Sequence, residues 1–158
     1  MSIKKIEAEI VAKPGSYGLI LKSENQAEVE IGKLATLTLQ KGYYLYFGSA
    51  MGPGGLQARV KHHYRRSDSL HWHMDYLRNV TELKQTWYHQ GEIKLEHKWA
   101  KLINQLKVSK IPLEGFGSSD CKCLAHLFYL QQIPDFNRFK QQNQEIIADT
   151  ENIKRLIF

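Results

Sequence analysis

A glycine-rich turn at residues 52–55 separates an aromatic strand pattern from a basic helix pattern, and this junction limits the possible folds more than any other stretch. The segment "GYYLYFGSA" at residues 42–50 is dense in aromatic residues, which predicts a largely buried strand. From Leu56, apolar side chains recur at Val60 and Tyr64, a spacing that predicts a helix. The glycines between the strand and the helix allow the backbone to approach a ligand at the helix N-terminus closely, and such a position is suitable for binding a phosphate.

Further strands and helices are predicted around this junction by the spacing of apolar residues. Strand patterns cover residues 16–23, 27–32, 34–42, 83–91 and 124–130, and helix patterns cover residues 71–80 and 93–106. The predicted fold class is α+β, with a central, mainly antiparallel sheet flanked by helices. We expect one domain over residues 1–134 and a C-terminal helical extension, residues 135–158, that packs on the same domain.

The helix predicted after the turn carries a dense run of basic side chains. Four of them share one face at the i, i+3, i+4 and i+7 spacing, and two more form a second basic pair: Arg59, His62, His63 and Arg66, then Lys61 and Arg65. The whole chain has a net charge of +6 and a pI of about 9.3. This balance favours a polyanionic partner such as nucleic acid, although a solvated basic face is the alternative.

Two tyrosines on predicted strands, Tyr17 and Tyr46, are candidates for chemistry. A tyrosine in a strand is normally a core residue whose hydroxyl is satisfied at the edge of the core. A functional tyrosine needs its hydroxyl near a cation, which favours the phenolate. Arg59 lies just past the end of the strand that carries Tyr46 and can supply that cation.

Glu96 lies in the clearest helix pattern of the chain, at the border of an apolar stripe that includes Leu95 and Trp99. A carboxylate there is partly desolvated. A hard cation such as Mg²⁺ or Mn²⁺ often takes one protein carboxylate together with waters and a substrate phosphate. Glu96 fits that description, and an exposed salt bridge is the alternative.

The order of these residues resembles the GIY-YIG nuclease superfamily. "GSY" at residues 15–17 and "YFG" at residues 46–48 stand where the superfamily has its two short motifs, followed by Arg59, His63 and Glu96 in the expected order. Three longer blocks, "GYYLYFGSAMGPGGLQARVKHH", "HWHMDYL" and "GFGSSDCKCLAHLFY", resemble the DUF123 family, a branch of that superfamily. The resemblance covers residues 15–129.

The resemblance implies a GIY-YIG-type fold and a metal-dependent endonuclease that hydrolyses phosphodiester bonds, with DNA as the expected partner. Tyr17 would be the general base, its pKa lowered by nearby cations, and Tyr46 would help to hold the attacking water. Arg59 would bind the scissile phosphate and His63 would assist proton transfer. Glu96 would hold one Mg²⁺ or Mn²⁺ ion, bound weakly until substrate arrives.

Other basic residues near these positions are expected to contact the nucleic acid. They belong to the predicted basic helix and to the "HWH" segment that follows it: Lys61, His62, Arg65, Arg66, His71 and His73. For the two histidines of "HWH", the alternative is capping and packing around Trp72.

The chain departs from the superfamily pattern at three places. Ser16 stands where isoleucine is usual in the first motif, which costs apolar contact, whereas Phe47 replaces isoleucine harmlessly in the second. Where many superfamily nucleases have a late asparagine, this chain has "GSSDC", and Ser118, Ser119 and Asp120 receive no role.

Two alternative functions follow from the same residues. In a non-catalytic nucleic-acid-binding module, the basic face would dock phosphates while Tyr17 and Glu96 served only the fold. In a zinc domain, Cys121, Cys123 and His126 would supply thiolate and imidazole ligands. Because C-x-C-x-x-H lacks the paired C-x-x-C arrangement of ordinary structural zinc sites, zinc is not expected.

The remaining features concern location. No stretch approaches the roughly 18 apolar residues of a membrane span, and "MSIKKIEAEIVAKPG" lacks the apolar core of a secretory signal. Two cysteines one residue apart make no disulfide framework, so the reduced cytoplasm is the expected compartment. No sequence feature specifies an oligomeric state.

Overall fold

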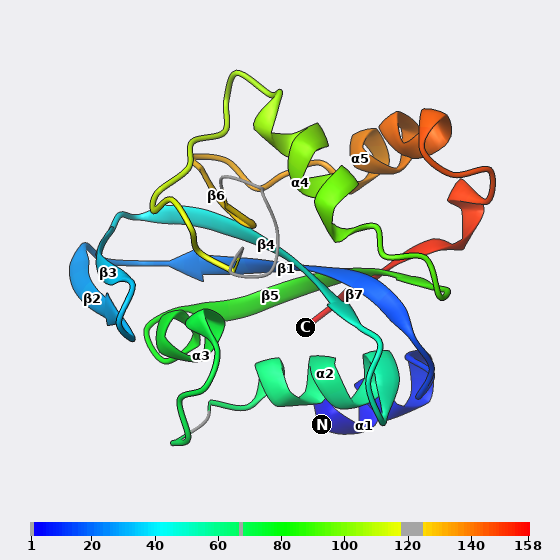
Figure 1. Cartoon of the computed structure of the whole chain (residues 1–158), viewed down its shortest axis with the longest axis horizontal. Helices are drawn as coiled ribbons and strands as arrows, with labels where there is room; N and C mark the ends of the chain where they lie inside the picture. The colour runs from blue at the N-terminus through cyan, green and yellow to red at the C-terminus, as the bar shows by residue number, and fades with distance from the viewer. Residues whose placement is uncertain (1, 67, 118–124) are drawn as a thin grey trace.

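The computed structural model describes residues 2–66, 68–117 and 125–158, and it has a central sheet with helices on both faces (Figure 1). Five antiparallel strands form this sheet in the order β6-β4-β1-β5-β7. Their bounds are β1 (Gly15–Ser23), β4 (Gly42–Ala50), β5 (Glu82–Gln90), β6 (Leu127–Leu130) and β7 (Ile153–Ile157). The predicted α+β class with a flanked antiparallel sheet is confirmed.

The central strand, β1, shows how side chains alternate between the two faces of the sheet. β1 pairs with β4 on one side and with β5 on the other, and Tyr17 lies opposite Gly48 and Tyr88. Because successive strand residues point to opposite faces, Tyr17 and Leu19 belong to one buried cluster while Ile20 belongs to the other. The sheet is therefore buried on both faces.

The helices divide between these two faces, as Figure 1 shows. One face is covered by α1 (Ser2–Glu9), α2 (Gly55–Tyr64) and α3 (His73–Arg78), and the other by α4 (Glu96–Asn104) and α5 (Phe136–Gln142). On the α4 side, Phe47 contacts Trp99 and Phe139 with ring centroids 5.8 and 5.9 Å apart. These aromatic contacts fix α4, and with it Glu96, against the sheet.

The strands β2 (Ala27–Ile31) and β3 (Ala35–Leu39) pair as a separate hairpin, as their alternating patterns predicted. The predicted helices at residues 71–80 and 93–106 are present as the shorter α3 and α4. The sequence did not lead us to expect α1. No helix among the described residues combines the length and apolar character that a membrane span requires.

The C-terminal segment differs from the predicted helical extension. It contains α5 and the 3₁₀ turns η1 (Asn143–Glu145) and η2 (Thr150–Asn152), but it ends in β7, which pairs with β5 along the edge of the sheet. The prediction of helix is therefore wrong for residues 153–157. The unpaired edge of β5 offers a row of backbone donors and acceptors, and pairing with that edge decides the conformation of the tail.

Candidate active site

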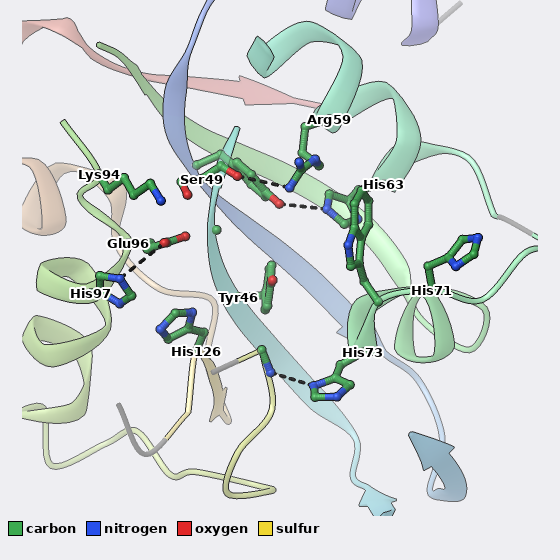
Figure 2. Close-up of a pocket in the computed structure, with 14 residues that line it drawn as sticks. Tyr46, Ser49, Arg59, His63, His71, His73, Lys94, Glu96, His97 and His126 are labelled. Atoms are coloured by element: carbon green, nitrogen blue, oxygen red, sulfur yellow. Dashed lines mark hydrogen bonds and ion pairs between the residues drawn. The ribbon is translucent and has the colours of Figure 1, made fainter. Parts of the chain in front are cut away.

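A pocket of about 290 Å³ lies where β1 and β4 meet the N-terminal part of α4 and one side of α2. All five residues predicted to be catalytic line it, and so do two of the predicted nucleic-acid contacts: Tyr17, Tyr46, Arg59, His63 and Glu96, with His71 and His73. In Figure 2, Arg59 and His63 lie on one side of the pocket, Lys94 and Glu96 lie on the other, and Tyr46 lies between them. Residues distant in the sequence thus converge on one hollow.

Tyr17, one of the residues that line this pocket, is fixed by a hydrogen bond and by a close fit against the neighbouring strand. Its side chain is only 1% exposed, and its hydroxyl lies 2.9 Å from Nε2 of His63. Gly48 faces the ring across the β1–β4 pair, where an added Cβ would lie 2.5 Å from the Tyr17 hydroxyl oxygen. The glycine of "YFG" is therefore required to seat the tyrosine of "GSY".

Burial controls the protonation of Tyr17 and His63. Desolvation raises the pKa of Tyr17 to about 12, and the opposing influence of the Arg59 charge is smaller. Desolvation also lowers the pKa of His63 to about 3, with the neighbouring His62 and Arg59 acting in the same direction. Both side chains are neutral at pH 7, so the predicted lowering of the Tyr17 pKa by nearby cations is wrong for the protein alone.

Arg59 presents the positive charge of α2 to the pocket. Its guanidinium donates a hydrogen bond to the Ser49 carbonyl over 3.1 Å and lies 4.4 Å from the centre of the Trp72 ring. These two contacts hold a planar group with several N–H donors at the pocket wall, a suitable partner for phosphate oxygens. Tyr46 also lines the pocket, and burial raises its pKa well above 10.0, so it is a neutral hydroxyl there.

Glu96 enters the pocket from the first position of α4. The buried Ser16 hydroxyl accepts the Leu95 N–H over 2.9 Å and lies 3.5 Å from the Ile93 carbonyl, so this hydroxyl ties the start of α4 to β1. The serine at the position where the sequence resemblance implies isoleucine therefore has a structural role: it places Glu96. Ser16 satisfies a backbone donor of a helix end, which isoleucine could not do.

The surroundings of Glu96 fit a weakly held divalent cation. Its side chain is 13% exposed, it is the one acidic side chain among the described residues that line the pocket, and His97 lies 3.5 Å from one of its oxygens. A hard cation with a single protein carboxylate must complete its coordination with water and substrate oxygens. Glu96 can act as such a ligand beside a phosphate on Arg59.

Three further residues at the pocket were missed or left with another role by the sequence reasoning. Lys94 and His97 line the pocket on either side of Glu96, and the basic residues around the glutamate in "IKLEHK" were the available signal. His126 lines it too, its ring centre 5.2 Å from that of His97, and burial lowers its pKa. Cys121 and Cys123 lie outside the described residues.

His71 and His73 also line the pocket, His71 from the segment before α3 and His73 from the first position of that helix. His73 accepts the Gly117 N–H through Nδ1 over 2.9 Å, and burial lowers its pKa. Its imidazole therefore helps to position Gly117. His71 is more exposed and hydrogen-bonds Ser69 over 3.0 Å.

The other basic residues of α2, and the two arginines that follow it, do not line the pocket. Among them, Lys61 lies 3.7 Å from Glu7, and Arg66 donates to the Thr81 carbonyl over 3.2 Å. Four of the predicted nucleic-acid contacts thus lie on a second surface, two on α2 and two just after its end: Lys61, His62, Arg65 and Arg66. The single basic face expected from the sequence is divided between two surfaces.

One cluster near the pocket has the composition of a metal site. Ligand atoms of His62, His63 and Asp75 all lie within 4.8 Å of one another. Asp75, however, already accepts the backbone N–H groups of His71 and Trp72, both over 3.0 Å, and it bonds His62 over 2.7 Å. These hydrogen bonds satisfy the carboxylate and lower its pKa despite its burial, so the cluster is stable without an ion.

Comparison with known proteins identifies the family of the chain. The family model described as "Domain of unknown function DUF123" matches residues 16–148, a range that runs from β1 past α5 and includes every residue predicted to be catalytic. No curated protein and no solved structure matches the chain. Since the match covers most of its length, the chain belongs to the DUF123 family.

Proposed function

We propose that the protein is a divalent-metal-dependent endonuclease that hydrolyses phosphodiester bonds in nucleic acid, with DNA as the expected substrate. The observation that carries the proposal is the convergence of Tyr17, Tyr46, Arg59, His63 and Glu96 on one pocket. They come from β1, β4, α2 and α4, and they were selected from the sequence by residue type, by spacing and by their order along the chain. The proposal includes the finer relationship of this chain to the GIY-YIG nucleases, which the same order of motifs supports.

Each side chain has a part in the proposed reaction that its contacts support. Arg59, held by the Ser49 carbonyl, binds the scissile phosphate and stabilises the charge that develops on its oxygens. Water attacks phosphorus, and the bond to the 3′ oxygen breaks. Tyr17 takes a proton from that water while its own proton passes along the 2.9 Å hydrogen bond to His63. Tyr46 donates a hydrogen bond into the site.

Glu96 would hold a Mg²⁺ or Mn²⁺ ion, which when bound stabilises negative charge on the leaving 3′ oxygen. The protein's own contribution is to aim a carboxylate at the substrate, and Ser16 and the aromatic contacts of α4 do this. Lys94, on the same side of the pocket, adds positive charge near the phosphate.

The proposal is tested by metal-dependent cleavage of flap, branched, single-stranded and duplex oligonucleotides. Wild type is compared with Glu96→Gln and Arg59→Ala, and with Glu92→Gln as a matched control, because Glu92 is an exposed glutamate four residues before Glu96. We expect wild type and Glu92→Gln to cleave with Mg²⁺ or Mn²⁺. Removal of a transition-state charge contact at Arg59 costs about 10²–10³-fold in rate.

The variants separate the proposed nuclease from its alternatives. Glu96→Gln is expected to keep salt-sensitive binding of the oligonucleotide and to lose metal-dependent cleavage. Salt-sensitive binding by all proteins without cleavage of any substrate would contradict the nuclease and favour a binding module. Equal cleavage by all four proteins would indicate a contaminating activity and contradict the roles of Glu96 and Arg59.

A further inference from the structure

Trp72 is an exposed aromatic side chain at the pocket, and the proposed reaction does not use it. It is 41% exposed, and among the large apolar side chains that the structure describes as exposed it is the one aromatic residue. The two other tryptophans, Trp87 and Trp99, are fully buried. An indole that only filled space between α2 and α3 would be expected to bury more of its surface.

The ring of Trp72 is held in place by its neighbours. Its backbone N–H donates to Asp75 over 3.0 Å, which fixes the residue at the start of α3. The His62 ring meets it edge-on with centroids 4.8 Å apart, and the Arg59 guanidinium lies over one face of the ring, 4.4 Å from its centre, so that a base would stack on the other face. Trp72 is thus a preorganised aromatic surface, and little conformational entropy is lost when a flat group stacks on it.

Because Trp72 lies next to Arg59, the aromatic surface is close to the position proposed for the bound phosphate. A phosphate on Arg59 brings the nucleotide that carries it to the same wall of the pocket, within reach of the indole. Aromatic side chains bind nucleobases by stacking, with little dependence on base identity. In a duplex, stacked neighbours cover both faces of each base, so an aromatic ring reaches a face only where the nucleotide is unpaired or displaced.

We propose that Trp72 is a stacking platform for an unpaired nucleotide next to the phosphate held by Arg59. The substrate class is then a nucleic acid with a single-stranded end, flap or displaced nucleotide at the scissile position. This inference rests on the proposed function, since the pocket must first bind a nucleic-acid phosphate.

The test compares binding to two labelled DNA hairpins that have the same stem, one blunt and one with a single-stranded overhang. Binding is measured by fluorescence anisotropy in EDTA, so that no cleavage occurs, for wild type, Trp72→Leu, Trp72→Phe, Arg59→Ala and Val80→Ala. Val80 is exposed and lies outside the residues that line the pocket, so its variant controls for the loss of an exposed apolar side chain.

We expect wild type to prefer the overhang hairpin. Trp72→Leu should weaken overhang binding roughly ten- to a hundredfold, the range for losing one stacked base, and should affect the blunt hairpin much less. Trp72→Phe should retain most of the preference, and Arg59→Ala should weaken both complexes. An equal loss on both hairpins, or no loss, overturns the stacking platform but leaves nucleic-acid binding in place. No binding of either hairpin overturns the proposed function as well.

Tryptophan fluorescence of the wild type supplies a readout that needs no variant. Because Trp87 and Trp99 are fully buried, a change in emission when the overhang binds reports on Trp72. Quenching by the overhang hairpin and not by the blunt one supports stacking. Binding of the overhang without any change in emission overturns it.

Discussion

Replacing Gly48 by alanine should displace Tyr17, because the strand pairing leaves no room for a methyl group. The new Cβ would lie 2.5 Å from the tyrosine oxygen and 2.7 Å from the ring carbon that bears it, closer than real Cβ contacts allow. Tyr17 is 1% exposed and bonded to His63, so it cannot move outward without breaking that bond. Overpacking of this kind costs about 1–3 kcal/mol. For a chain of this size that lowers the melting temperature by roughly 2–12 °C.

The matched control is Gly52→Ala, the same substitution at the turn, where an added Cβ would meet nothing within 4 Å. Alanine there reduces the entropy of the unfolded chain and should change stability by no more than about +1 kcal/mol. Thermal and urea unfolding of both variants are compared with wild type. If Gly48→Ala and Gly52→Ala unfold at the same temperature, then Tyr17 does not pack closely against Gly48 of β4, and the prediction is wrong.

The remaining predictions concern the groups around this fit. Ser16→Ala leaves the buried Leu95 N–H without its acceptor, so the free energy of unfolding should fall by about 1–3 kcal/mol, and metal-dependent cleavage should become slower. An unchanged melting temperature in calorimetry would contradict this prediction. The pKa of His63 is about 3 in the folded protein and 6.5 in the unfolded chain, so between pH 7 and 5 the unfolded chain takes up a proton that the folded protein does not. The free energy of unfolding of the wild type should therefore fall by about 2 kcal/mol over this range. Urea titrations should show a smaller fall for His63→Gln. The pKa of Tyr17 is raised from 10.0 to about 12, so stability should fall above pH 10, and Tyr17→Phe should show a shallower fall over that range.

The sequence was informative where a repeating pattern decides the structure. Alternation in β2 and β3 and the apolar stripe of α4 predicted those elements, since one buried face is enough to specify strand or helix. The order of Tyr17, Arg59 and Glu96 predicted which side chains would meet. β7 was missed because its pairing depends on the free edge of β5, which no local pattern in the tail encodes.

The division of the basic helix shows why the rest of the site was not predictable. Arg59 and His63 are four residues apart and face the pocket together, as helical spacing predicts. His62, only one position from His63, is turned by about 100° around the helix and bonds Asp75 instead. Which of two adjacent histidines enters a pocket depends on how the helix is rotated against the sheet, and that is set by packing.

The environments of Tyr17 and His63 also restrict how the proposed chemistry can work. Burial moves their pKa values in opposite directions, so the tyrosine keeps its proton and the histidine stays without one over a wide range around neutral pH. Two titratable groups whose pKa values are moved apart by their environments identify the proton donor and the proton acceptor of a site. Tyr17 alone is therefore a poor base, and it can accept a proton from water only as it gives its own to His63. In the proposed reaction the base is the hydrogen-bonded pair, and Gly48 matters to chemistry because it keeps the two rings in contact.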